Sequence, residues 1–271
     1  MKLTNLFRIL LMTVFMGASS AYAGPFILAG TDADDHGFVS GGANVDGWLF
    51  MQKALENIAP GVTNGNTTVA IMGSSGSAGA AANSAFNLSS LNPGWSVTTV
   101  DTVDFAGFFN GTGTTNVNNV GIMMMDSGLN VGGGVDGSLF TPYASAIDTF
   151  VGNGGGLFSQ ANGYDWLSAL LPSVTTSGEF QTGITLTAAG QAAFPGLTNA
   201  DLSAGPHHNS FDNFSPLSSL GVNSNGNTII IGSAGGSITN PEPPASVPEP
   251  GTLALFGLGL AGLSLVRRRK S

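Results

Sequence analysis

The chain has 271 residues, with 41 glycines, no cysteine and a formal net charge of −9. Its length fits one large domain or two small ones. The lack of cysteine excludes disulfides, thiolate metal sites and a cysteine nucleophile, and the acidic balance excludes the basic surface that nucleic-acid binding needs.

The first 23 residues have the pattern of a secretory signal peptide. Lys2 and Arg8 give a positively charged start, and a short apolar run follows them. Ala21 and Ala23 place small side chains at the two positions that a signal peptidase accepts. The apolar run is too short to cross about 30 Å of hydrocarbon. We therefore expect export with cleavage after Ala23 rather than an uncleaved anchor.

Between the two ends of the chain, short apolar runs alternate with helical patterns. The expected strands are residues 26–30, 68–72, 96–100, 120–125, 157–159 and 228–231, and the expected helices are 45–59, 78–91, 140–151 and 164–171. Continuous apolar strands that alternate with helices predict an α/β fold, with a mainly parallel sheet and helices on both faces, over residues 24–239. An all-β surface repeat is the alternative, but the sequence shows no repeat period.

The body between the two terminal segments is strongly acidic. Residues 24–247 contain Lys53 as their one Lys or Arg and hold 15 of the 16 acidic residues, which gives this region a formal charge of about −14. Because it has no arginine, the body lacks the bidentate clamp that binds phosphate or carboxylate groups.

Acidic and histidine side chains gather in two segments of the body. Asp32, Asp34, Asp35 and His36 follow the first expected strand, and His207, His208 and Asp212 come much later. Carboxylate oxygens and imidazole nitrogens both bind divalent metals. His208 and Asp212 are four residues apart and would share a face of a helix. If the two segments meet at one end of the sheet, we expect them to form a metal site. Ordinary polar turns are the alternative.

A Gly/Ser-rich loop at 73–79 follows the second expected strand. Its backbone N–H groups could bind an anion at the start of a helix, but it lacks the lysine of a P-loop, and a plain turn is the alternative. Ser75 and Ser159 follow or end strands and are candidate nucleophiles of a serine hydrolase, although the sequence has no G-x-S-x-G motif.

A second pattern in the body is A-I-D-T-F-V-G-N-G-G-G-L-F-S at 146–159, with F-P-G-L at 194–197 and G-P-H-H at 205–208. This order resembles class I glutamine amidotransferase-like domains, especially their ThuA-like branch. The resemblance implies a flavodoxin-like sheet over residues 26–236. The family's nucleophile is a cysteine, which this chain lacks, and the ThuA-like histidine falls near Ala161. We therefore expect the body not to inherit amidotransferase chemistry.

The C-terminal segment combines a proline motif, an apolar run and a basic cluster. Pro248, Glu249 and Pro250 precede an uncharged run at 252–266, and Arg267, Arg268, Arg269 and Lys270 follow it. As a helix the run would be about 22 Å long, and basic residues after it would stay on the cytoplasmic side. We expect a single membrane-spanning helix with the body outside, after a Pro-rich spacer at 240–247.

The order of these three parts resembles the PEP-CTERM sorting signal, here residues 248–271, and an ordinary tail anchor is the alternative. The resemblance implies recognition by an exosortase-type membrane protease in a bacterium that makes an exopolysaccharide. It also implies a transient membrane anchor and then a place at the cell surface or in the extracellular matrix.

Two functions for the body follow from these observations. The first is a non-catalytic binding or structural module, with exopolysaccharide as a candidate partner. The alternative is a metal-dependent or serine hydrolase that acts on polysaccharide or sugar derivatives. Exported cargo that binds no ligand is a third reading of the same sequence.

Overall fold

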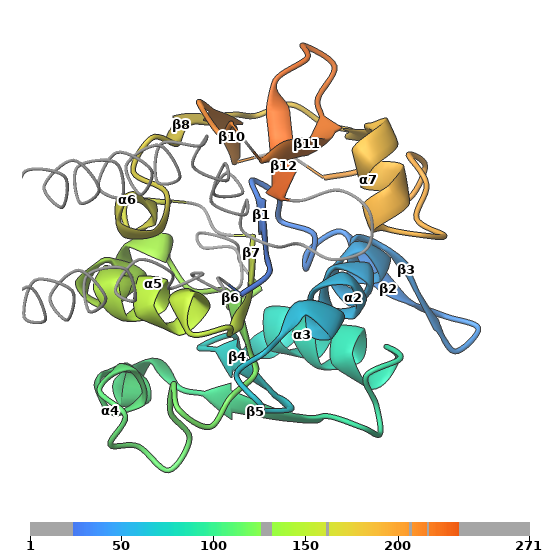
Figure 1. Cartoon of the computed structure of the whole chain (residues 1–271). Helices are drawn as coiled ribbons and strands as arrows, with labels where there is room; N and C mark the ends of the chain where they lie inside the picture. Colours follow the sequence, from blue (N-terminus) through green and yellow to red (C-terminus); the bar gives the residue numbers. More distant parts are fainter. Residues whose placement is uncertain (1–23, 126–131, 161–162, 206–207, 216, 233–271) are drawn as a thin grey trace, which may run out of the picture. The chain divides into compact units, whose positions relative to one another are not determined.

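A computed structural model describes residues 24–125, 132–160, 163–205, 208–215 and 217–232, all of which belong to one compact unit, Tyr22–Asn240 (Figure 1). An eight-stranded sheet forms its centre. In spatial order the strands are β5 (Ser96–Val100), β4 (Thr68–Met72), β6 (Ile122–Met125), β7 (Gly156–Ser159), β1 (Phe26–Ala29), β12 (Thr228–Gly232), β11 (Ser218–Val222) and β9 (Thr185–Leu186). Two smaller sheets pair β2 (Gly37–Ser40) with β3 (Ala43–Asp46) and β8 (Thr175–Gly178) with β10 (Asn209–Asp212).

The five strands from β5 to β1 are parallel, whereas β12, β11 and β9 add to the sheet in antiparallel pairs. The expected mixed α/β fold with a mainly parallel sheet is confirmed at this level. The strand order differs from the 2-1-3-4-5 order of flavodoxins, because β1 lies beside β7, with Ile27 opposite Phe158. An apolar run predicts a buried strand but carries no information about which neighbour it pairs with.

Helices cover both faces of the sheet (Figure 1). One face packs against α2 (Gly47–Ile58), α3 (Gly76–Asn87) and α7 (Ala188–Ala193), and the other against α4 (Phe105–Phe109), α5 (Ala144–Gly152) and α6 (Leu167–Leu170). Short 3₁₀ helices are η1 (Ala59–Gly61), η2 (Thr102–Asp104) and η3 (Gly137–Tyr143). Successive strand residues point to opposite faces, so Ile27 joins the core under α2 while Phe26 and Leu28 join the core under α5.

Three of the expected helices differ from the observed ones. The helix expected at 78–91 is α3, which begins two residues earlier and ends four residues earlier. The helix expected at 164–171 is confined to α6, and the one expected at 140–151 begins as η3 and becomes α5 at Ala144. Pro142 lies inside η3, and proline has no N–H to donate to an α-helical hydrogen bond. The main helix α2 begins and ends within two residues of its expected bounds, because its buried face follows the apolar spacing.

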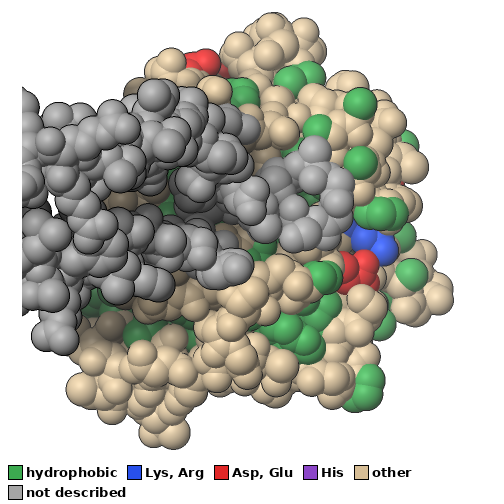
Figure 2. All heavy atoms as spheres, viewed as in Figure 1, with side chains coloured by type: hydrophobic (Ala, Val, Ile, Leu, Met, Phe, Trp, Pro, Cys, Tyr) green, Lys and Arg blue, Asp and Glu red, His purple; other side chains and the backbone are tan. Residues whose placement is uncertain are grey.

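The surface in view carries few charged side chains (Figure 2). Lys53, the one Lys or Arg among the described residues, donates to the Glu56 carboxylate at 2.8 Å. On the face in view, uncharged side chains and backbone therefore make up most of the visible surface.

Candidate functional site

The carboxyl end of β1 is where the two acidic and histidine segments meet. The Gly30 carbonyl accepts a hydrogen bond from the His208 N–H at 2.7 Å, and the Gly30 N–H donates to the Ile229 carbonyl at 2.8 Å. A Cβ atom on residue 30 would lie 1.8 Å from the Asn209 carbonyl oxygen. The start of β10 therefore docks directly on the end of β1, at a position where the backbones leave no room for a side chain.

Asp32 lies between two imidazoles at this junction. Its Oδ2 atom is 3.3 Å from Nε2 of His36 and 3.4 Å from Nε2 of His208. The Asp32 side chain is 7% exposed, against 33% for His36 and 18% for His208. The second contact is an ion-pair distance rather than a hydrogen bond, since the buried His208 Nε2 atom has no hydrogen-bond partner in the described part of the chain.

A tight turn after β1 brings His36 back towards Asp32. The Asp35 N–H donates to the Asp32 carbonyl at 3.0 Å, and the His36 N–H donates to the Ala33 carbonyl at 3.3 Å. The backbone of Gly205, with φ of +100°, packs against the imidazole of His36, where a Cβ would approach the ring to 2.9 Å. The ring is therefore close to both the Asp32 carboxylate and the Gly205 backbone.

Asp34 faces a different set of partners. Asp34 is 2% exposed, and its Oδ1 atom accepts a hydrogen bond from Gln160 Nε2 at 3.4 Å. The Thr31 hydroxyl donates to Gln160 Oε1 at 3.3 Å, and the Trp48 indole donates to the Asp34 carbonyl at 2.7 Å. Gln160 thus links the ends of β1 and β7. Sequence analysis missed it, although a polar residue directly after an apolar strand was a usable signal.

Asp35 is an exposed residue that borders the cluster. Partial burial of its carboxyl, followed by the negative charge of Asp32, raises its pKa, while His36 and His208 act in the opposite direction. Its carboxylate interacts electrostatically with Asp32, whereas the close contacts with His36 and His208 are made by Asp32.

The expected helical pairing of His208 with Asp212 is wrong. Residues 209–212 form strand β10, in which Asp212 is exposed and lies opposite Thr175 of β8. Four residues of extended chain span about 13 Å, so Asp212 is displaced from the Asp32 cluster. His207 lies outside the described residues.

The space beside the cluster is small. A hollow of about 20 Å³ is bordered by Asp32, His36, Asp201 and Gly205, among others. That volume holds about one water molecule or ion. Over the described ranges, no group of three or more His, Cys, Asp and Glu side chains is arranged to hold a metal ion.

The Gly/Ser loop after β4 uses its donors internally. The N–H groups of Ser75 and Ala78 donate to the carbonyls of Gly133 and Gly132, both at 3.0 Å. The Ser75 hydroxyl also donates to the Gly133 carbonyl, at 3.3 Å, and Ser159 is fully buried. These contacts favour the plain-turn interpretation. The Ser75 side chain is exposed, whereas the Ser159 hydroxyl is closed to solvent.

Comparison with known proteins identifies the C-terminal segment. The family model described as PEP-CTERM protein-sorting motif matches residues 246–270, a range that contains Pro248, Glu249, Pro250 and the arginine cluster. The motif implies export, membrane-associated sorting and processing by exosortase. No helix within the described ranges is long and apolar enough to cross a membrane, and the run at 252–266 lies outside them. No curated protein and no solved structure matches the chain, so the likeness of the body to ThuA-like domains has no support from them.

Proposed function

We propose that residues 24–239 are a non-catalytic binding module that acts outside the cytoplasmic membrane. In this proposal a signal peptidase removes residues 1–23, and an exosortase cuts near Pro248–Pro250. The body then remains at the cell surface or in the extracellular matrix. The motif at 246–270 supports the exosortase step.

The observation that carries the non-catalytic role is the size of the hollow at the Asp32 cluster. Small-molecule and substrate sites usually enclose about 300–1,000 Å³, whereas the hollow beside Asp32 and His36 encloses about 20 Å³. A hydrolase must place a substrate bond against its acid, base or metal-bound water. The space beside this cluster suits a single bound ion or water between the turn after β1 and residues 201–205.

A hydrolysis assay on the exported protein tests this proposal. We expect no release of reducing ends from neutral or acidic polysaccharides, with or without added Ca²⁺ or Zn²⁺. Release that persists in an Asp212→Asn control but is lost in His208→Ala would overturn the non-catalytic role, because Asp212 is exposed and displaced from the cluster.

A metal-dependent hydrolase of polysaccharide or sugar derivatives is the second candidate function. The position of Asp32 between His36 and His208 favours it, because ligands of one metal bonded at about 2.1 Å lie roughly 3–3.5 Å apart. Since these three side chains do not by themselves form a metal site, this function needs a further ligand such as His207. It requires near-stoichiometric metal in protein purified without chelator and loss of that metal in His207→Ala. The metal-dependent function would be excluded if the protein is purified without metal and its melting temperature does not change when Ca²⁺ or Zn²⁺ is added.

A further inference from the structure

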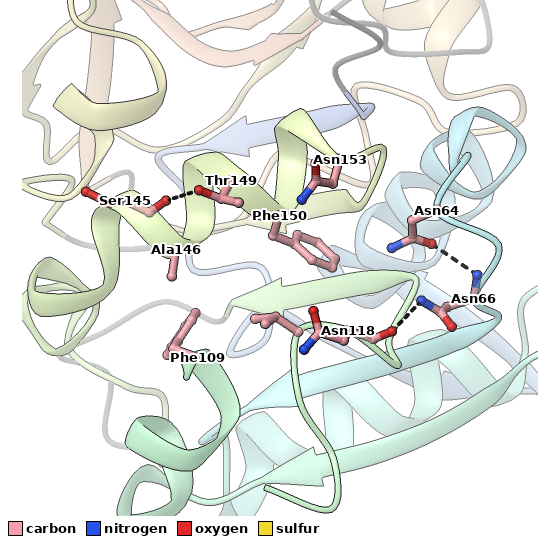
Figure 3. A pocket seen from close by; sticks show the side chains of 10 residues that line it. Asn64, Asn66, Phe109, Asn118, Ser145, Ala146, Thr149, Phe150 and Asn153 are labelled. Atoms are coloured by element: carbon pink, nitrogen blue, oxygen red, sulfur yellow. Dashed lines mark hydrogen bonds between the residues drawn. The ribbon is translucent and has the colours of Figure 1, made fainter. Parts of the chain in front are cut away.

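The amino ends of the parallel strands border a much larger pocket. Its volume is about 530 Å³, and it lies where Asn64 and Asn66 precede β4, Asn118 precedes β6 and Asn153 follows α5 (Figure 3). The Asp32 cluster lies at the carboxyl end of β1. Because β1, β4 and β6 are parallel strands of one sheet, the pocket and the cluster are at opposite edges.

The polar groups of this pocket are uncharged. Among the residues that the structure describes, no Asp, Glu, Lys, Arg or His lines it. The Asn64 side chain is fixed, since it donates to the Val120 carbonyl at 2.9 Å and accepts from the Asn66 N–H at 3.1 Å. The exposed side-chain amides of Asn118 and Asn153 have no hydrogen-bond partner within the described part of the chain. Two amides, each with donors and an acceptor, are therefore available to a ligand.

An apolar wall completes the pocket. Phe109 comes from α4 and Phe150 from α5, and Figure 3 shows the Phe150 ring directed into the space that Asn118 and Asn153 border. Both phenylalanines are largely buried, at 6% and 4% exposure, so the protein core holds the rings in place. The pocket thus combines a small, fixed apolar surface, since little of either ring is accessible, with exposed side-chain amides.

We propose that this pocket binds a neutral sugar unit of a glycan. Sugar hydroxyls both donate and accept hydrogen bonds, as amides do, and the C–H groups of a sugar ring can contact the small apolar surface that Phe109 and Phe150 leave accessible. A cation would favour an anionic ligand, yet Lys53 is paired with Glu56 and does not line the pocket. A cationic ligand would need a carboxylate there.

A peptide fits this pocket less well than a sugar. Peptides that bind as an added strand require an open sheet edge, whereas β4 and β6 each pair with a strand on both sides. The pocket therefore offers side-chain amides rather than a free backbone edge. The inference extends the proposed binding function to a ligand class, at a site separate from the Asp32 cluster.

Calorimetric titration of the full chain with neutral oligosaccharides of glucose, mannose and xylose tests this inference, with oligogalacturonate as the acidic probe. We expect at least one neutral sugar to bind and the double variant Asn118→Ala, Asn153→Ala to weaken its binding about tenfold or more. Asn225→Ala, at an exposed asparagine in the β11–β12 turn, is the matched control and should bind normally. Equal melting temperatures would show that the variants fold.

Three results would overturn the inference: no binding of any neutral probe, unchanged binding by the double variant, or tighter binding of the acidic probe or of an unstructured peptide. If the sugar-binding test fails, the proposal for the Asp32 cluster is unaffected, because the two sites are separate. Conversely, hydrolysis that depends on His208 would overturn the non-catalytic proposal and leave sugar binding at the amide pocket in place.

Discussion

Oδ2 of Asp32 lies 3.4 Å from Nε2 of His208, so one buried carboxylate joins the first strand of the domain to a segment near its end. The same oxygen lies 3.3 Å from His36. Removing one partner of a buried ion pair leaves the other charge uncompensated. The contact adds to the backbone hydrogen bond between Gly30 and His208 at the junction of β1 and β10.

A double-mutant cycle measures this contact. We expect Asp32→Asn and His208→Gln to be non-additive in the free energy of unfolding, with a coupling of about 1 kcal/mol or more, because the side chains touch. The measurement is urea unfolding of the wild type, the two single variants and the double variant. The control cycle pairs His208→Gln with Asp212→Asn and should be additive within about 0.5 kcal/mol. Additivity in both cycles would contradict the contact.

The sequence was most informative where strands are apolar throughout. Thr68–Met72 and Thr228–Gly232 are buried over most of their length, so their runs of apolar residues predicted strands at the correct positions. Strands β8 and β10 read T-T-S-G and N-S-F-D. They carry no such pattern and form because they pair with each other.

The candidate site was predictable only in part for the same reason. Asp32, His36 and His208 were identified by residue type, and the structure brings these three side chains together. That the two segments hold a metal stays a prediction. Asp212 was misplaced because a four-residue spacing was interpreted as helical in a segment that pairing makes extended. Gln160 entered only with the structure, since its role depends on β7 lying beside β1.

Gly30→Ala tests the close approach of the two backbones. We expect it to destabilise the domain by about 3 kcal/mol or more, since a Cβ there would lie 1.8 Å from the Asn209 carbonyl oxygen. Chemical denaturation measures the change. Gly152→Ala is the matched control, because a Cβ there meets nothing within 4 Å and alanine favours the helix by up to about 1 kcal/mol. Equal stability of the two variants would refute the packing argument.

Glu56 should make stability depend on pH. Burial by itself would raise the pKa of its carboxyl, but hydrogen bonds from Lys53, Gln52 and the Ser90 N–H outweigh burial and lower the pKa. The native state therefore binds this proton less readily than the unfolded chain. Its stabilising contribution is present above the unfolded pKa and disappears as pH falls through the lowered native value.

The measurement for Glu56 is the melting temperature of the wild type and of Glu56→Gln from about pH 7 down to about pH 3. We expect the wild-type advantage to shrink as the solution becomes acidic, because glutamine keeps the shape but does not titrate. Asp148→Asn, at an exposed carboxylate on α5, serves as the control for general charge effects. An advantage that stays constant over this range would disprove the assignment.

Intact-mass spectrometry of the protein from its native host tests the sorting step. We expect a mature chain that lacks residues 1–23 and has lost the tail after a cut near Pro248–Pro250, in line with the motif at 246–270. Replacing Arg267, Arg268 and Arg269 by alanine removes the basic cluster that holds the tail on the cytoplasmic side, so the variant should keep its tail. A wild-type mass that includes both terminal segments would argue against sorting. If the arginine variant is still cut, the proline motif is recognised without the basic cluster.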